Sequence, residues 1–239
     1  MLRVTVWVNP LKASFSDKRL PTSDEILGFM CPPGVPSDSA SIHTRYQAIT
    51  EVQPLFFAPP KDDRILTQLV WPLRHAKASC MVGNYLGTIA MAGIVSEMTA
   101  ILMFDIAEVK VGNAPITEAG QKGLFGRTFE KLGQERRIGV LKEFGIALPV
   151  VADAYERIRE IRNRHLHLAQ LVDVEELARD ARQIFRDAVT VVAAAIGQDM
   201  KDGTLVLTES MARYLERAGA VTQSDDAATD PKDATTDDL

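Results

Sequence analysis

Residues 84–97 read Asn-Tyr-Leu-Gly-Thr-Ile-Ala-Met-Ala-Gly-Ile-Val-Ser-Glu, and they belong to a stretch from Ala78 to Ser96 that contains no charged side chain. This stretch is nineteen residues long, and a helix of about that length can span a bilayer. Its glycines, its asparagine and the adjoining Glu97 instead favour a helix buried inside a globular protein, with a membrane span as the alternative. The sequence therefore predicts a mainly α fold around one long helix from about residue 76 to 108.

The charges of the chain are distributed unevenly. The 239 residues include 27 Lys and Arg against 32 Asp and Glu, a formal net charge of −5. Residues 220–239 contain six aspartates and one lysine, which accounts for the whole imbalance and leaves residues 1–219 neutral. A neutral body excludes a polybasic protein that coats nucleic acid by bulk charge. Because residues 220–239 also lack large apolar side chains, we expect a disordered acidic tail.

Cysteines and motifs limit the chemistry and the location. The two cysteines, Cys31 and Cys80, are too few for a disulfide framework or a zinc site, so the sequence predicts no metal and a reducing compartment. The N-terminus lacks the basic and apolar segments of a secretory signal, so we expect a cytoplasmic protein without a membrane partner. No phosphate-binding glycine loop, Gly-x-Ser-x-Gly, His-Glu-x-x-His or Cys-x-x-Cys motif occurs, and no cofactor is expected.

The first 64 residues are predicted to form a separate, β-containing segment. They hold eight of the twelve prolines, a density that disfavours long helices. Apolar residues alternate along Leu2–Val8, which is typical of a strand with one buried face, and a second strand is expected near Val52–Phe57.

Residues 65–219 are predicted to form a helical domain. Asp173 and Glu176 predict a capping box at the start of one helix, Thr208 a cap at the start of another, and Gly219 the end of the latter. A short strand is expected at Thr204–Leu207. From periodicity and these signals, the expected helices are Asp63–His75, Ala76–Glu108, Phe129–Phe144, Ala152–Leu168, Val174–Ile196 and Glu209–Ala218.

One basic helix contains two of the four histidines. Residues 155–168 read Tyr-Glu-Arg-Ile-Arg-Glu-Ile-Arg-Asn-Arg-His-Leu-His-Leu. The pattern Arg162-Asn163-x-x-x-His167 resembles the Arg-x4-His motif of the HEPN superfamily. The order of helices over residues 76–197 is also similar to that family, as is the run of small residues before the acidic Glu97.

This resemblance implies an HEPN-like four-helix bundle, a homodimer and metal-independent cleavage of RNA. On this sequence it makes His167 the acid/base at the 2′-hydroxyl, Arg162 the group that holds phosphate, and Asn163 an orienting residue. An imidazole titrates near neutral pH and a guanidinium fork matches phosphate oxygens, so these residue types suit the chemistry. Positions 162 and 167 lie about 140° apart on a regular helix, so they converge only if the helix ends early or a second subunit contributes.

Glu97 is a further candidate, because its helical neighbours on the predicted central helix are apolar. A carboxylate on such a face is unfavourable without a cation, and we expect Glu97 to orient Arg162 or His167. Residues 121–167 carry ten Lys and Arg against six acids, a net of +4. Such a patch can guide a phosphate backbone, or it can be an ordinary solvated surface.

Structural explanations exist for the same residues. His165 lies on the apolar stripe of its helix and is expected to be a buried, hydrogen-bonded histidine, although Arg159 and His165 form an alternative Arg and His pair. Arg162 can serve in an ion pair, and His167 can interact with the helix dipole. The alternative function is therefore a non-catalytic dimerisation or interaction module.

Overall fold

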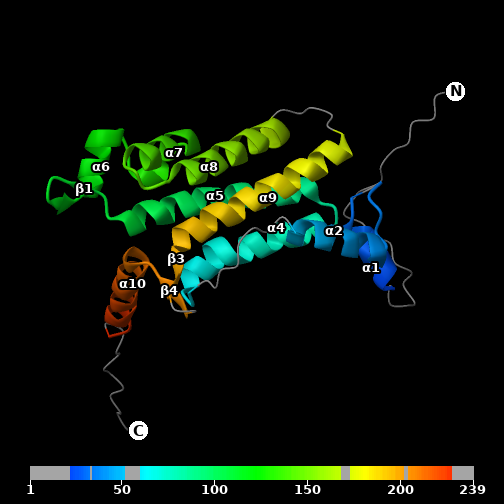
Figure 1. The fold of residues 1–239 in the computed structure, drawn as a ribbon, viewed down its shortest axis with the longest axis horizontal. Helices are drawn as coiled ribbons and strands as arrows, with labels where there is room; N and C mark the ends of the chain where they lie inside the picture. The colour runs from blue at the N-terminus through cyan, green and yellow to red at the C-terminus, as the bar shows by residue number, and fades with distance from the viewer. Residues whose placement is uncertain (1–21, 33, 52–59, 168–172, 202–203, 228–239) are drawn as a thin grey trace, which may run out of the picture.

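The structure is a computed structural model that describes residues 22–32, 34–51, 60–167, 173–201 and 204–227, and the protein is mainly α-helical (Figure 1). The helical elements in chain order are α1 (Ser23–Met30), α2 (Ser39–Glu51), α3 (Asp63–Ile65), η1 (Leu66–Val70), α4 (Trp71–Met81), α5 (Tyr85–Ala107), α6 (Glu118–Phe125), η2 (Phe129–Lys131), α7 (Gln134–Glu143), α8 (Pro149–Arg162), η3 (Asn163–His167), α9 (Val174–Ile196) and α10 (Glu209–Ala227). The described strands form two antiparallel hairpins, β1 (Lys110–Val111) with β2 (Ala114–Pro115) and β3 (Gln198–Lys201) with β4 (Thr204–Leu207).

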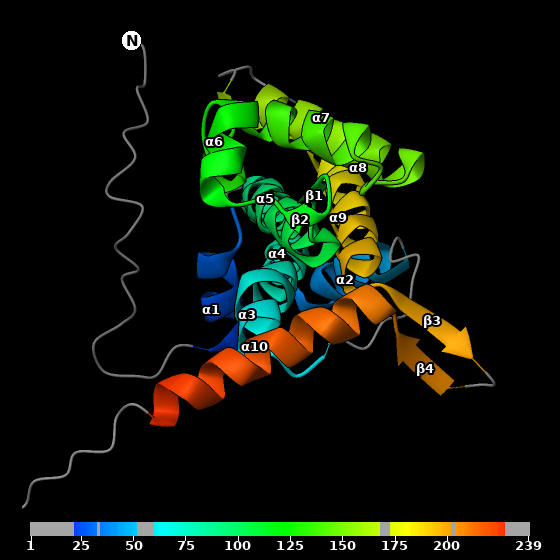
Figure 2. The same cartoon turned by 90° about the vertical axis from the view of Figure 1, so that its left-hand side faces the viewer.

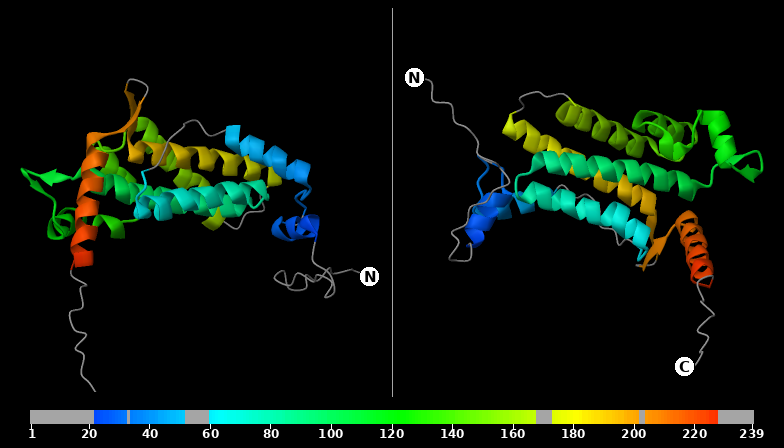
Figure 3. Two further views of the ribbon diagram at one scale, coloured as in Figure 1. Left: turned by 90° about the horizontal axis from the view of Figure 1, so that it is seen from below. Right: turned by 180° about the vertical axis from the view of Figure 1, so that it is seen from behind.

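The core forms around α5. Helix α9 packs along α5, α4 packs on both, and α8 covers α5 and α9 on the side opposite to α4 (Figures 1 and 3). Helix α10 crosses one end of this group, while α1 and α2 lie at the other end (Figures 1 and 2). Removing apolar surface from water drives this packing. The core residues of α5 and α9 with no exposed surface include Ile89, Ala92, Val95, Ala100, Ile184, Ala188, Val191 and Val192.

The predicted central helix is interrupted, so the expectation of one helix over residues 76–108 is wrong. Helix α4 ends at Met81 and α5 begins at Tyr85. Gly83 has φ +74, a conformation that glycine adopts easily, and the Asn84 side chain caps α5 by accepting from Gly87 N. Among the described residues, α5 alone has the length and composition to cross a membrane, and more than half of it is buried in the protein.

The described part of residues 1–64 contains two helices, α1 and α2, where the density of prolines predicts only short elements and loops. Helix α1 begins with a capping box in which the Thr22 side chain accepts from Glu25 N and the Glu25 carboxylate accepts from Thr22 N. Pro32 and Pro36 lie between α1 and α2, so they separate the two helices without interrupting either one. The strands predicted at Leu2–Val8 and Val52–Phe57 lie outside the described residues.

The remaining elements agree with the sequence in part. Helix α9 has the predicted bounds, and β4 is the strand predicted at Thr204–Leu207. The capping box predicted at Asp173 is wrong, because its side chain makes no cap hydrogen bond. The helix predicted at Phe129–Phe144 is a 3-10 turn followed by α7, since the backbone is extended at Leu132 and Gly133. Helix α10 continues past Gly219, so the predicted tail begins too early; residues 228–239 lie outside the described residues.

Candidate functional site

Glu97 on α5 and Arg162 at the end of α8 form an ion pair, in which Arg162 Nη1 donates to Glu97 Oε1. Both side chains are partly exposed. Gly93 lies one turn before Glu97 on the same helix, and a Cβ atom added there would be 2.7 Å from Arg162 Cδ. The missing side chain at Gly93 therefore lets the stem of Arg162 lie against α5. The structure thus brings together two of the residues that the sequence singled out.

Arg137 on α7 is the second cation beside Glu97. Its Nη1 lies 3.8 Å from Glu97 Oε2, and its side chain is only 9% exposed. The guanidinium also donates to the carbonyl oxygens of Phe129 and Glu130, which fixes it in place. We call Glu97, Arg137 and Arg162 the Glu97 cluster. One carboxylate faces two guanidinium groups, so the cluster carries a local excess of one positive charge.

A polar residue links this cluster to the buried face of α5. Gln134 Oε1 accepts from Arg137 Nη1, and Gln134 Nε2 donates to Ser96 Oγ at 3.1 Å. Ser96 directly precedes Glu97 and is buried. Sequence reasoning missed both Arg137 and Gln134. Nothing in the sequence distinguishes Arg137 from the other cations of residues 121–167, because its role depends on the packing of α7 against α5.

The winding of the chain changes immediately after Arg162. Helix α8 ends there, and residues Asn163–His167 form a π-helical turn. A π-helical turn joins residues five apart by hydrogen bonds, so such residues return to about the same face. This winding removes most of the 140° separation expected for positions 162 and 167 on a regular helix. Asn163 is exposed, and the side chain of His167 lies outside the described residues.

His165 is buried within this turn and does not join the Glu97 cluster. Its side chain is 1% exposed, and Nε2 lies 2.7 Å from Asp180 Oδ2 of α9. Arg164 Nη1 donates to the same oxygen at 2.9 Å. The buried Nδ1 of His165 has no hydrogen-bond partner among the described residues. His165 therefore ties the π-helical turn to α9.

Arg159 is directed to a neighbour on its own helix. Its Nε donates to Glu156 Oε2 at 2.9 Å, and this hydrogen bond raises the pKa of Arg159. Arg159 and His165, the alternative Arg and His pair, thus contact different partners. Arg159 pairs with Glu156 on α8, and His165 contacts Asp180 on α9.

Arg157 fixes α8 to α9 through two hydrogen bonds. Its Nη2 and Nε donate to the two carboxylate oxygens of Asp187, at 2.7 and 3.1 Å. The Asp187 side chain is 3% exposed and also accepts from Gln183. Buried carboxylates require such partners. The pair therefore sets the position of the helix that ends at Arg162.

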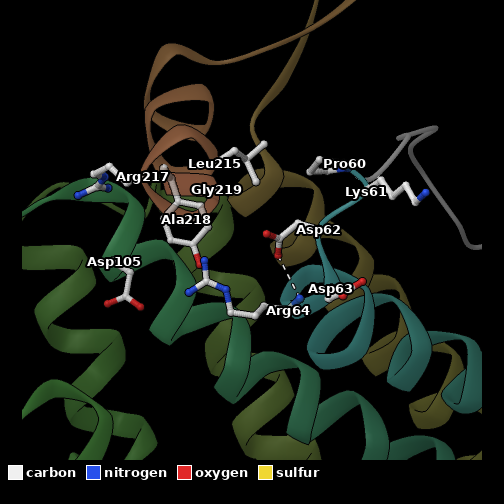
Figure 4. A pocket seen from close by; sticks show the side chains of 11 residues that line it. Pro60, Lys61, Asp62, Asp63, Arg64, Asp105, Leu215, Arg217, Ala218 and Gly219 are labelled. Atoms are coloured by element: carbon white, nitrogen blue, oxygen red, sulfur yellow. Dashed lines mark hydrogen bonds between the residues drawn. The ribbon is translucent and has the colours of Figure 1, made fainter. Parts of the chain in front are cut away.

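A separate cavity of about 1010 Å³ lies at the α10 end of the molecule (Figure 4). Arg64 lies over the ring of Tyr214, with Cζ 5.2 Å from the ring centre, and Asp105 faces the same space. Desolvation by the surrounding protein raises the pKa of Asp105 to about 6, and the nearby Glu130 adds to this effect. Asp105 is two turns of α5 beyond Glu97, so this cavity and the Glu97 cluster are distinct.

The described residues contain no group of three or more His, Cys, Asp or Glu side chains arranged to hold a metal ion. The chemistry that the Glu97 cluster can perform is recognition of an anion by Arg162, because the guanidinium is partly exposed and its buried Nε has no acceptor in the described structure. No protein-family model, curated protein or solved structure matches the chain.

Proposed function

We propose that the protein is a metal-independent endoribonuclease of the HEPN type, active as a cytoplasmic homodimer. In this proposal α8 and α9, together with α5 and α7, correspond to the helices of an HEPN-like four-helix bundle. Arg162 holds the scissile phosphate, His167 is the general base, and Asn163 orients the substrate. Glu97 positions Arg162 without contacting RNA.

One observation carries the proposal: the Glu97 and Arg162 pair is followed directly by a π-helical turn that ends at His167. The pair holds the guanidinium at a defined place, and the turn returns position 167 toward the face of position 162. Single π-helical turns associated with α-helices occur frequently at functional sites. A positioned cation beside a titratable imidazole is what phosphodiester cleavage requires.

The proposed reaction is an internal transesterification. His167 removes the proton of the 2′-hydroxyl, the 2′ oxygen attacks the adjacent phosphorus, and the bond from phosphorus to the 5′ oxygen breaks. The products are a 2′,3′-cyclic phosphate and a 5′-hydroxyl, whose proton comes from an acid or from water. Arg162 stabilises the negative charge that develops on the phosphate oxygens.

The test is cleavage of labelled single-stranded RNA by purified full-length protein in EDTA. We expect cleavage to persist in the chelator and to fall at least 100-fold in Arg162→Ala and His167→Ala, in line with loss of a charge-stabilising group or a general base. Arg159→Ala is the matched control, because it removes an arginine of the same helix whose ion pair among the described residues is with Glu156. Equal activity in all four proteins would contradict the proposal.

A second candidate is a non-catalytic interaction module. The observation that favours it is that Arg157, Arg162 and Arg164 are each bound to an acidic side chain, as expected of cations with a purely structural role. A folded dimer that binds RNA or protein but cleaves no RNA in the same assay would support this candidate. Sedimentation of the purified protein measures the oligomeric state directly.

A further inference from the structure

The outward face of α4 combines an exposed tryptophan with an arginine that has no acidic partner among the described residues. Trp71 is 53% exposed, and Arg74, His75 and Ala78 are also exposed. These four residues line a cavity of about 480 Å³. Their spacing of three, four and seven residues places them on one side of the helix, opposite Leu73, Ala76 and Cys80, which face the core.

The cations of this face have no acidic partner in the described structure. Arg74 makes neither a hydrogen bond nor an ion pair with the residues described, and Lys77, on the neighbouring side of α4, forms no ion pair with them. The chain from residue 64 to residue 96 contains no aspartate or glutamate, so the helix supplies no acid of its own. The face is therefore positively charged, and charge complementarity selects a polyanion as its partner.

A second aromatic residue with a cation borders this face. Lys77 of α4 lies over the ring of Tyr46 of α2, with Nζ 4.9 Å from the ring centre, and His43 packs beside Tyr46 at 6.5 Å between ring centres. Tyr46 and His43 are exposed. Aromatic rings that alternate with cations are the arrangement by which proteins bind single strands, because bases stack on the rings while phosphates contact the cations.

We propose that this face of α4 is a docking surface for single-stranded RNA, with a base stacked on Trp71 and phosphates bound by Arg74 and Lys77. The choice of RNA rests on the proposed function, whereas the surface itself does not. Helix α4 lies on the opposite side of α5 and α9 from α8, so the strand is held away from the Glu97 cluster (Figure 1). The surface thus adds affinity for the strand without taking part in cleavage.

The test uses the fluorescence of Trp71. The chain contains two tryptophans, so Trp7→Phe leaves Trp71 as the sole emitter. The ligand is a 2′-O-methylated single-stranded RNA of about twelve nucleotides, which the proposed reaction cannot cleave. We expect quenching by this strand but not by polyphosphate or by double-stranded RNA, whose bases are already stacked. Binding without quenching of Trp71 would overturn the proposal.

Variants give an independent measurement by fluorescence anisotropy of the labelled strand. Trp71→Leu should weaken binding about tenfold through loss of stacking, and Arg74→Gln should weaken it severalfold and reduce its salt dependence. Lys110→Gln is the control, since it removes one exposed positive charge from β1. Unchanged affinity in the Trp71 and Arg74 variants, or no binding of RNA at all, would contradict the proposal.

The outcome is separable from that of the proposed function. If the Arg162→Ala variant cleaves no RNA but the strand still quenches its Trp71 fluorescence, then docking on α4 and catalysis at the motif are independent. If the wild-type protein cleaves RNA without any quenching, the enzyme proposal stands and the docking surface is wrong.

Discussion

The side chain of Arg162 occupies the space that a Cβ atom on Gly93 would need. Such an atom would lie 2.7 Å from Arg162 Cδ, closer than Cβ atoms approach other side chains in folded proteins. The atom that must give way belongs to a flexible side chain and not to the backbone. Substitution at Gly93 therefore acts on the position of Arg162 more than on the fold. This relationship separates the role of the ion pair from the stability of the helix bundle.

Gly93→Ala should leave the protein folded while displacing Arg162 from Glu97. Alanine favours the interior of a helix over glycine by about 1 kcal/mol, which offsets the local rearrangement. We expect a melting temperature close to that of the wild type and at least a tenfold loss of RNA cleavage. Gly139→Ala is the control, since its Cβ would meet no atom within 4 Å. Full cleavage by Gly93→Ala would show that the position of Arg162 is unimportant.

Glu97→Gln should destabilise the protein. The substitution leaves the guanidinium groups of Arg137 and Arg162 near each other without a carboxylate, and Arg137 is almost fully buried. We expect a loss of about 1 to 3 kcal/mol in the free energy of unfolding, measured by urea denaturation. Added salt should restore part of the loss, because it screens the repulsion. If both stability and cleavage match the wild type, the pairing has no role.

Arg157→Ala should be more damaging than Arg159→Ala, although both remove an arginine of α8 that pairs with an acid. Loss of Arg157 leaves Asp187, whose side chain is 3% exposed, without its main partner. Loss of Arg159 leaves the partly exposed Glu156 in contact with water. We expect Arg157→Ala to lower the free energy of unfolding by about 2 kcal/mol. This value lies below the range for buried pairs because Arg157 itself is 46% exposed. The change for Arg159→Ala should be within about 0.5 kcal/mol of zero. Equal losses in denaturant melts would contradict this assignment.

Asp105 gives the stability a pH dependence that Asp105→Asn should remove. Desolvation raises its pKa in the folded protein from 3.8 to about 6. The folded state thus holds the proton of Asp105 more tightly than the unfolded state. The stability that this proton contributes is fully present below pH 3.8 and is lost as the pH rises to about 6. Since Asp105 is partly solvent-exposed, the effect is on the order of 1 kcal/mol after screening. We expect the variant to unfold at higher urea than the wild type at pH 7.5 but not at pH 4, and no difference at either pH would refute the shift.

Helix α9 shows what local sequence determines well. Its buried residues recur at intervals of three and four, and both ends coincide with the prediction because Asp173 and Gly197 flank that stripe. Glu97 was also identifiable, since a carboxylate among apolar helical neighbours requires a cation. The sequence narrowed the partner of Glu97 to Arg162 or His167 of one predicted helix, but it did not decide between these two residues.

The break at Gly83, the π-helical turn after Arg162 and the role of Arg137 could not be predicted in the same way. Gly83 and Asn84 are residue types that end and begin helices, but the uncharged, apolar composition around them suits a continuous helix equally well. The π-helical turn contains His165, whose side chain contacts Asp180 on α9. The π-helical turn and the role of Arg137 depend on contacts between segments distant in sequence, which periodicity does not record.

The burial of α5 has a consequence for synthesis of the protein. Its most extensive partner, α9, begins at Val174, 67 residues after α5 ends at Ala107. A ribosome adds roughly 5 to 20 residues each second, so α5 emerges several seconds before α9 exists. During that interval α4, α7 and α8 can cover parts of α5, but the side chains of α5 that pack on α9 face the solvent. Until α9 has been made, the nascent chain therefore exposes an apolar side of α5, a helix whose composition resembles that of a membrane span.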